Sequence, residues 1–454
     1  MAKIFISFLG VGFGGDFTKA GYDQASYRFE DGSVSRPTCF AQRAIIEREG
    51  ATSFDAIYLL MTPESKERHR KILVDELVSI GCNPDNQIRE DDSITSNQDT
   101  GQQWAWFHAL QEKISDGDQV IFDFTHGFRS VPIIFSTAIS FLQKVKRFEL
   151  MHAYYGYVVK EDGKIINSEI IDMAKFYRIN DWADGVARLV DMADASKLAE
   201  LAEEGRADGF AALNDPALTQ ALRELTGLIK NIDVNNVGKK ADEALCLIAQ
   251  KQQQCSGADA QLLKMVVEKF SNLAMKASDR YDRNYFQLQL ILTGMLLKHG
   301  LNMQAFTVMR ECVASIGMLG LSLSEGYTGK NLFNSEGRSK LRPRFGDVFV
   351  NLCQFEKSKW HYETEEGRES LSHDPYKLND YDHVLKPFYE RLEACGIAGQ
   401  LQSFTRSMND YRNGFDHAWT AKAQALPDIS AKGGEFLSQL TETIDLLNEH
   451  KFFK

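Results

Sequence analysis

The residues best suited to chemistry directly follow a short apolar run, Gln119–Phe124. They carry several hydrogen-bond donors and one flexible backbone position: Thr125, His126, Gly127, Arg129 and Ser130. A helix is expected to begin near Pro132, because proline is favoured in the first turn of a helix. Donors and free amides at the positive end of a helix suit a phosphate or another anion. The alternative is an ordinary strand-to-helix turn in an α/β domain.

A glycine-rich loop follows the first apolar stretch of the chain. Gly10, Gly12 and Gly15 match the G-x-G-x-x-G pattern of dinucleotide sites. The context argues against such a site, because no apolar helix follows and no acidic residue ends the next strand, Tyr58–Thr62. A flexible loop at the carboxyl end of a strand remains, and Met61 and Thr62 end the neighbouring strand. Open α/β sheets bind ligands at this edge.

A second group of polar residues lies near the C-terminus, where Arg412, Asn413 and His417 stand between Tyr411 and Trp419. On an ideal helix Arg412 and His417 lie about 140° apart. They share a face only if the helix ends or kinks, for which Gly414 is the expected place. A two-fold axis would also bring two such groups around one phosphate. The alternative is an amphipathic helix with an exposed arginine and a capping histidine.

The first part of the chain alternates strands and helices. Strands are expected over 2–9, 54–61 and 119–124, with a poorer one near 86–89. Hairpins are expected over 21–36 and over 148–170, and helices over 37–49, 63–80, 99–115 and 131–145. This alternation predicts a doubly wound, mostly parallel sheet. Trp104, Trp106 and Phe107 are expected to pack in its core.

After Asp172 helical patterns replace strands. Helices are expected over 172–204, 214–231, 237–254, 258–277, 283–299, 302–318, 380–395, 396–421 and 433–450. The expected domains are an α/β domain over 1–172, a helical connector over 173–230 and an all-α domain over 231–454 with a polar insertion near 326–379. Arg338, Lys340, Arg342 and Arg344 are expected to form a solvated basic loop, which would also suit RNA guidance.

Composition narrows the class of protein. The chain has 454 residues, of which 43% are hydrophobic and 25% charged, with a net charge of −11. These values are typical of a soluble globular protein and disfavour non-specific coating of nucleic acid. Seven cysteines without a C-x-x-C pair predict a reducing, cytoplasmic location, and no histidine pattern predicts a metal site. The longest apolar run, near 131–142, is too short to cross a bilayer, and no signal peptide is expected.

Three motifs together resemble a known family. They are the start of the chain at 4–10, the Asp-Phe-Thr-His-Gly-Phe-Arg-Ser-Val-Pro run at 123–132, and the Arg-Asn-x3-His run at 412–417. These residues resemble the CRISPR-associated CARF–HEPN ribonucleases of type III systems. The resemblance implies an α/β Rossmann-like N-terminal CARF domain plus an all-α C-terminal HEPN domain, assembled as a homodimer or a higher even oligomer.

The resemblance also implies a role for each candidate residue. The CARF domain would bind a cyclic oligoadenylate, most simply cyclic tetra-adenylate, as an allosteric activator. Its expected contacts are Gly10, Gly12, Met61, Thr62, Thr125, His126, Gly127, Arg129 and Ser130. The HEPN domain would cleave single-stranded RNA without a metal ion or cofactor. His417 would act as general base or acid, Arg412 would stabilise phosphate charge and Asn413 would orient the phosphate or the histidine.

Other readings of the same residues stay open. The helical half is alternatively an inactive assembly or binding module attached to the same sensor. A transcription regulator would need a basic helix-turn-helix, which the acidic C-terminal half disfavours. Slow cleavage of the activator by the CARF domain itself would depend on His126 or Thr125, and simple binding is the preferred alternative. Neither a membrane association nor stable DNA binding is expected.

Overall fold

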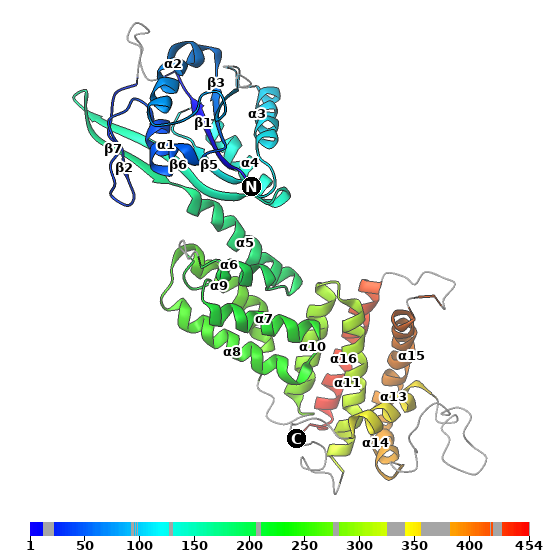
Figure 1. Ribbon diagram of the computed structural model, residues 1–454. Helices are drawn as coiled ribbons and strands as arrows, with labels where there is room; N and C mark the ends of the chain where they lie inside the picture. Colours follow the sequence, from blue (N-terminus) through cyan, green and yellow to red (C-terminus); the bar gives the residue numbers. More distant parts are fainter. Residues whose placement is uncertain are drawn as a thin grey trace. The chain divides into compact units, whose positions relative to one another are not determined.

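The chain folds as two compact units, Met1–Asp181 and Trp182–Lys454, named here the N-terminal unit and the helical unit (Figure 1). This computed structural model describes residues 1–11, 22–91, 95, 97, 99–126, 130–205, 210–275, 281–324, 341–355, 382–417, 419–420 and 429–453. The further division predicted at 172 and 230, with a separate connector, stays a prediction.

A seven-stranded sheet organises the N-terminal unit, with strand order β2-β7-β6-β5-β1-β3-β4. The strands are β1 (Lys3–Leu9), β2 (Arg28–Phe29), β3 (Ala56–Met61), β4 (Ile88–Asp91), β5 (Gln119–Asp123), β6 (Glu149–Glu161) and β7 (Lys164–Asp172). Neighbouring strands from β6 through β5, β1 and β3 to β4 are parallel, whereas β7 returns antiparallel to β6. Parallel strands joined by helices confirm the predicted Rossmann-like α/β fold.

Helices cover both faces of this sheet (Figure 1). On one face α1 (Ala41–Glu49) and α2 (Pro63–Ser79) pack against the side of β1 that carries Phe5. On the other face α3 (Thr100–Lys113) and α4 (Val131–Val145) pack against the side that carries Ile4 and Ile6. Successive residues of a strand point to opposite faces, so the continuous apolar run of β1 serves both layers.

The strand order reverses between β1 and β5. After β1 and the edge strand β2, the chain forms β3 and β4 on one side of β1, and it then returns to form β5 on the other side of β1. Ligands of open α/β sheets bind in the crevice outside the carboxyl ends of the strands at such a switch point. The sheet therefore directs attention to the residues that follow Leu9 and Asp123.

Several element boundaries differ from the sequence prediction. The helix expected from residue 37 begins at Ala41, because the backbone of Thr38 pairs with that of Ala25. The single helix expected over 172–204 is divided at Ala193, whose φ is 49°. The turn predicted at Asp31-Gly32 is confirmed, with Gly32 at φ 83°.

The helical unit contains no strand among its described residues, as predicted for an all-α domain. Its α-helices, together with α5, which crosses the unit boundary, are α5 (Ala174–Met192), α6 (Ser196–Glu203), α7 (Pro216–Lys230), α8 (Val234–Gln252), α9 (Gly257–Phe270), α10 (Arg283–Lys298), α11 (Asn302–Ser322), α13 (Asp347–Gln354), α14 (Asp382–Ala394), α15 (Ile397–Asp416) and α16 (Ile429–Glu449). Two short 3₁₀ turns, η1 (Ala51–Ser53) and η2 (Ser271–Leu273), and one π-helical turn, η3 (Arg342–Gly346), complete the described elements.

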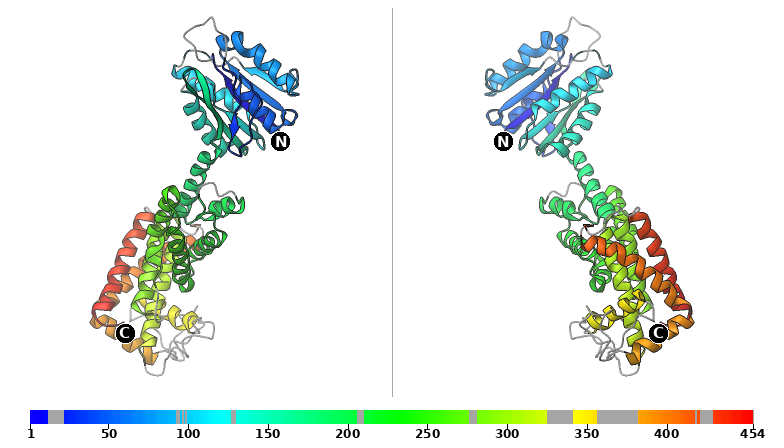
Figure 2. Two further views of the ribbon diagram at one scale, coloured as in Figure 1. Left: turned by 90° about the vertical axis from the view of Figure 1, so that its left-hand side faces the viewer. Right: turned by 90° about the vertical axis from the view of Figure 1, so that its right-hand side faces the viewer.

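The buried helix α11 forms the centre of the helical unit. It contacts α10, α13, α14, α15 and α16, which lie around it in Figures 1 and 2. By length and composition α11 is apolar enough to cross a membrane, but 78% of its apolar window is buried inside the protein. Because these side chains pack in the protein core, α11 is read as a core helix.

Part of the predicted polar insertion belongs to the core. Within 326–379 the structure describes residues 341–355, where Phe345 and Phe349 are fully buried. Arg342 was expected in a solvated loop, but its guanidinium lies 2.5 Å from Glu311 and 3.1 Å from Asp347. These carboxylates raise the pKa of Arg342 although its burial opposes this. Arg342 thus ties η3 to α11, while Arg338 and Lys340 lie outside the described residues.

Two glycines of the helical unit should respond in opposite ways to alanine. A Cβ at Gly320 would lie 2.4 Å from the Phe388 ring, whereas one at Gly434 has no neighbour within 4 Å. We expect Gly320→Ala to lower the free energy of unfolding by about 1–3 kcal/mol through overpacking. Gly434→Ala should raise it by up to about 1 kcal/mol, because alanine is the better helix former. Urea unfolding followed by circular dichroism measures both, and a destabilised Gly434→Ala with a neutral Gly320→Ala would contradict this packing.

Candidate functional site

The structure brings the two predicted loops of the N-terminal unit to one edge. Strands β1 and β5 are parallel neighbours, with Ser7 opposite Asp123 in the register. Gly10 follows β1, and Thr125 and His126 follow β5, so these residues lie at the switch point. Of the other predicted contacts, Gly12, Gly127 and Arg129 lie outside the described residues.

A buried carboxylate holds this edge together. Asp123 is fully buried and accepts a hydrogen bond of 2.6 Å from the Ser7 hydroxyl. Its other oxygen accepts the backbone N–H of Thr125 at 3.0 Å and the Thr125 hydroxyl at 2.5 Å. Burial raises the pKa of Asp123, and these hydrogen bonds oppose the rise. Asp123 therefore joins the end of β1 to the first residues of the loop after β5.

The Thr125 hydroxyl makes its hydrogen bonds within the protein. Its hydroxyl donates to Asp123 and accepts the backbone N–H of Gly156 at 2.8 Å. A Cβ on Gly156 would lie 3.0 Å from this hydroxyl oxygen, so the contact favours glycine there. Because its hydroxyl already donates a hydrogen bond to Asp123, Thr125 is better placed to orient the loop than to donate to a phosphate.

Two histidines meet at this edge, of which the sequence indicated only one. The rings of His126 and His69 lie 4.4 Å and 4.9 Å from the ring of Tyr22, measured between centroids. His69 comes from α2, and its Nε2 lies 3.1 Å from the backbone oxygen of Val11, in the first glycine-rich loop. Nothing in the sequence near His69 indicates this placement, because 57 residues separate it from His126.

The imidazole of His126 is held neutral. Its Nε2 is buried and has no hydrogen-bond partner among the described residues. Burial lowers the pKa of His126 to about 4, and the nearby His69 adds to this effect. A neutral imidazole with one unused ring nitrogen is able to accept or donate one hydrogen bond to a ligand, depending on its tautomer.

The residues predicted at the end of the neighbouring strand have structural roles. Met61 is fully buried in the core beside α1 and α2. Thr62 is the N-cap of α2, where its hydroxyl accepts the Ser65 backbone N–H and its own N–H bonds to the Ser65 hydroxyl. Ser130 is the N-cap residue of α4, although its side chain does not cap that helix.

The second candidate site lies at the C-terminal end of α15. Arg412 and Asn413 belong to its last turns, and His417 is its C-cap residue. Asn413 and His417 are exposed, and the Arg412 side chain is 34% exposed. The three polar groups predicted from the sequence are thus presented to solvent at one helix end.

Aromatic packing fixes this helix end. The ring of Phe306 from α11 lies 5.5 Å from Tyr411 and 5.4 Å from Phe415, and Phe415 lies 5.2 Å from Trp419. The predicted break at Gly414 is wrong, because α15 continues to Asp416. Gly414 instead leaves space for Trp419, since a Cβ at Gly414 would lie 2.3 Å from that ring. The helix ends at His417, whose backbone N–H still bonds to the carbonyl oxygen of Asn413.

An acidic neighbour of this site was not anticipated. Asp416 lies 3.1 Å from the guanidinium of Arg412, one turn along the helix. Exposed ion pairs of this kind contribute about 0.3–0.5 kcal/mol. Asp416 thus holds the Arg412 guanidinium only weakly, and the pair orients the arginine along the helix.

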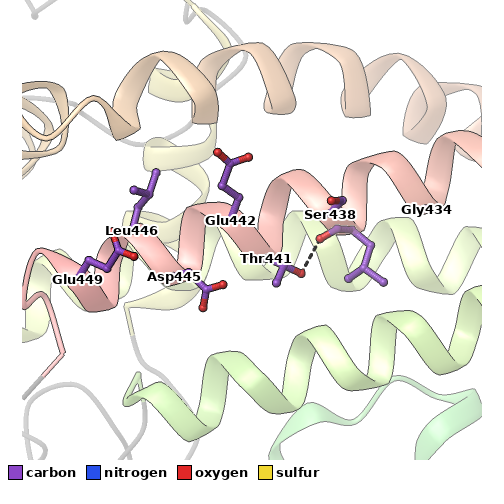
Figure 3. A pocket seen from close by; sticks show the side chains of 8 residues that line it. Gly434, Ser438, Thr441, Glu442, Asp445, Leu446 and Glu449 are labelled. Carbon is purple, nitrogen blue, oxygen red and sulfur yellow. Dashed lines mark hydrogen bonds between the residues drawn. The ribbon is translucent and has the colours of Figure 1, made fainter.

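Neither candidate site coincides with the pocket that the structure describes along α16. This groove has a volume of about 680 Å³ and is lined mainly by polar and acidic side chains of α16, including Glu442, Asp445 and Glu449 (Figure 3). Its carboxylates would repel a phosphate backbone. No group of three metal-ligating side chains occurs within the described residues.

Comparisons with known proteins agree with the motifs. No protein-family model matches the chain. Over 143 residues it is 24% identical to a CRISPR-associated protein of Methanocaldococcus jannaschii, which is 31% of this chain and 20% of that protein. The chain thus spans about a fifth of the length of the curated relative that it matches. This match confirms the predicted resemblance to CRISPR-associated proteins.

One solved structure is also similar. Csm6 of Enterococcus italicus, bound to cyclic hexa-2′-fluoro-hexa-dAMP, aligns with a TM-score of 0.49 and 12% identity. The alignment covers 99% of this chain and 94% of that chain. At this identity and TM-score, neither a residue role nor a ligand transfers from that structure to this chain.

The neutral state of His126 makes a prediction about pH. An imidazole with a lowered folded-state pKa stabilises the fold above its unfolded pKa of about 6.5, and this stability is lost as pH falls toward about 4. Between these values the wild type should therefore lose free energy of unfolding more steeply than His126→Gln, by about 1 kcal/mol per pH unit. Urea unfolding at several pH values measures the difference. Parallel curves for the two proteins would show that His126 is not held neutral.

Proposed function

We propose that the chain is an effector of type III CRISPR defence that binds a cyclic oligoadenylate in its N-terminal unit and then cleaves single-stranded RNA with its helical unit. The observation that carries the proposal is the group of Arg412, Asn413 and His417, exposed together at the end of a helix whose other side is anchored in an aromatic core. The similarity to a CRISPR-associated protein supports the biological setting.

The ligand would occupy the switch-point edge of β1 and β5. A cyclic oligoadenylate presents phosphates, ribose hydroxyls and adenine rings. Backbone amides near Gly10 and at the start of α4 would take phosphate oxygens, because helix N-termini favour anions. The free ring nitrogen of His126 would bond to a ribose or a base, and Ser130 would add a hydroxyl. Thr125 would position this loop through Asp123.

A two-fold ring fits a two-fold protein. Even-numbered cyclic oligoadenylates have two-fold symmetry, so a homodimer would present the same residues to each half of the ring. We favour cyclic tetra-adenylate, with cyclic hexa-adenylate as the ring to test beside it. Ring binding would shift the dimer between two arrangements of the helical units.

Cleavage would proceed by attack of the RNA 2′-oxygen on the adjacent phosphorus. The bond from phosphorus to the 5′-oxygen breaks, so the products carry a 2′,3′-cyclic phosphate and a 5′-hydroxyl. His417 would move a proton, either from the 2′-hydroxyl or to the leaving 5′-oxygen. Arg412 would stabilise the charge that develops on the phosphate oxygens, and Asn413 would orient the phosphate or the imidazole. None of these steps uses a metal ion or a cofactor.

The cleavage residues predict a ring-dependent activity. In EDTA, a fluorescent single-stranded RNA should be cleaved with one ring and not without it. His417→Ala and Arg412→Ala should each reduce the rate by about 10²–10³-fold, the usual loss for an acid–base or charge-stabilising group. His450→Ala is the matched control, because His450 is an exposed histidine just after α16. Rates that do not change in His417→Ala would move the helical unit to the alternative reading, an inactive assembly or binding module.

The binding residues predict a different kinetic signature. Ser130→Ala and His126→Gln should raise the ring concentration that gives half-maximal cleavage about tenfold each, as expected for the loss of one hydrogen bond. The maximal rate at saturating ring should stay close to that of the wild type, because the cleavage residues are unchanged. A titration of ring at fixed RNA measures both quantities. A fall in maximal rate with an unchanged midpoint would place these residues outside the binding site.

A further inference from the structure

The ends of three helices in the helical unit carry lysines that gather around one histidine. Lys230, Lys269 and Lys298, named here the lysine cluster, stand in the last turns of α7, α9 and α10. Helix α10 ends at its C-cap residue His299, and it contacts both α7 and η2, the turn that directly follows α9. The charges of all three lysines act on the imidazole of His299. Each lysine alone suits the negative end of its helix, but their convergence has no such explanation.

Two lysines of this cluster have no partner that neutralises them. The Nζ atom of Lys230 lies 3.4 Å from a carboxylate oxygen of Asp194. In contrast, Lys269 and Lys298 form neither an ion pair nor a hydrogen bond with any residue that the structure describes. Burial lowers the pKa of Lys269, the charge of Lys298 lowers it further, and Asp191 opposes both effects. The two ammonium groups therefore repel one another, and an anion between them would relieve this repulsion.

The imidazole of His299 adds polar atoms to the cluster but no charge. Both of its ring nitrogens are buried and lack a hydrogen-bond partner among the described residues. Burial, followed by the charge of Lys269, lowers the pKa of His299 to about 4, so the ring is neutral at pH 7. Buried polar atoms are almost always hydrogen-bonded in folded proteins. The one N–H of a neutral imidazole is a donor that suits a phosphate oxygen.

The lysine cluster lies at the same end of the helical unit as the proposed cleavage residues. Helix α11 begins just after His299, and its Phe306 packs on Tyr411, which directly precedes the Arg-Asn-x3-His run. At the same end, a Cβ on Gly433 of α16 would lie 2.5 Å from Leu297 of α10. These helices stand beside one another in Figure 1. A strand of RNA that reaches the end of α15 therefore passes close to the end of α10.

We propose that Lys269 and Lys298, together with His299, bind a backbone phosphate of the RNA strand beside the segment that is cut. This inference rests on the proposed function and adds a second contact for its substrate. RNA carries a phosphate on every nucleotide, so a strand held at Arg412 presents further phosphates to the surface next to it. On a chain with a net charge of −11, two unpaired ammonium groups offer a phosphate a local positive potential. Such a contact raises affinity for RNA of any sequence.

The salt dependence of RNA binding tests this contact. The full-length His417→Ala protein, with the ring present, serves as the non-cleaving parent, and fluorescence anisotropy gives its Kd for a labelled single-stranded RNA at several KCl concentrations. Each phosphate contact on a single strand contributes about 0.7 to the steepness of log K against log salt. Lys269→Ala combined with Lys298→Ala should lower this steepness by about 0.7 to 1.4. Lys269→Arg combined with Lys298→Arg keeps both charges and should preserve it.

A second pair of lysines provides the matched control. Lys239→Ala combined with Lys264→Ala removes the same charge from α8 and α9, where each lysine already lies within 4.0 Å of a glutamate one turn along its helix. This control should leave the salt dependence unchanged, and circular dichroism should show intact folding for every variant. An unchanged steepness after loss of Lys269 and Lys298, or an equal loss in the control, would overturn the proposal.

Parallel cleavage assays separate this proposal from the proposed function. Ring-dependent cleavage by the wild type, with an unchanged salt dependence in the Lys269 and Lys298 variant, would overturn the phosphate site alone. A reduced salt dependence in that variant, without cleavage by the wild type, would support the phosphate site and contradict the proposed cleavage. A parent protein that does not bind RNA at all would overturn both.

Discussion

The pairing of β1 with β5, fixed by the buried Asp123, is the constraint on which the N-terminal unit depends. The carboxylate accepts a hydrogen bond from the Ser7 hydroxyl of β1. It also accepts hydrogen bonds from the backbone N–H and the hydroxyl of Thr125, in the loop after β5. A buried carboxylate without such donors would cost several kcal/mol. Once these bonds form, the end of β1 and the first residue of the loop after β5 have fixed positions relative to one another. The strand order creates the candidate ligand edge, and Asp123 connects the two strand ends that form it.

In the helical unit, apolar contacts fix the second candidate site. The proposed cleavage requires Arg412, Asn413 and His417 to reach solvent and to keep a fixed geometry. Phe306, Tyr411, Phe415 and Trp419 provide this by packing the buried side of the same turns. Rigid support beneath exposed polar groups is what a catalytic or binding constellation requires. Gly414 contributes to this packing, because the absence of a side chain there leaves space for the Trp419 ring.

The fold class and the location of both candidate sites could be predicted from the sequence. The apolar runs of β1, β3 and β5 are short and bounded by turn residues, and the helices after Asp172 follow a clear helical period. The roles of individual side chains were harder to predict from the sequence. Thr125 is a donor in the motif, but only the structure shows that its hydroxyl donates a hydrogen bond to Asp123. His69 reaches the same edge from a distant helix, and no local pattern indicates it.

Errors in the sequence prediction have physical causes. Trp104 and Trp106 both looked like core residues, but two positions on a helix are about 200° apart, so only Trp106 can face the sheet. Arg342 looked solvated because its neighbours are basic, whereas its carboxylate partners come from α11 and the start of α13. In each case the deciding contact lies outside the local stretch of sequence.

We propose that a ring bound to the N-terminal unit switches on a metal-independent transesterification at Arg412 and His417. The most direct test is mass spectrometry of the RNA termini formed with and without cyclic oligoadenylate. The proposed chemistry predicts 2′,3′-cyclic phosphate and 5′-hydroxyl termini that form only when the ring is present. Products with 3′-hydroxyl and 5′-phosphate termini, or the same products in equal yield without the ring, would contradict the account.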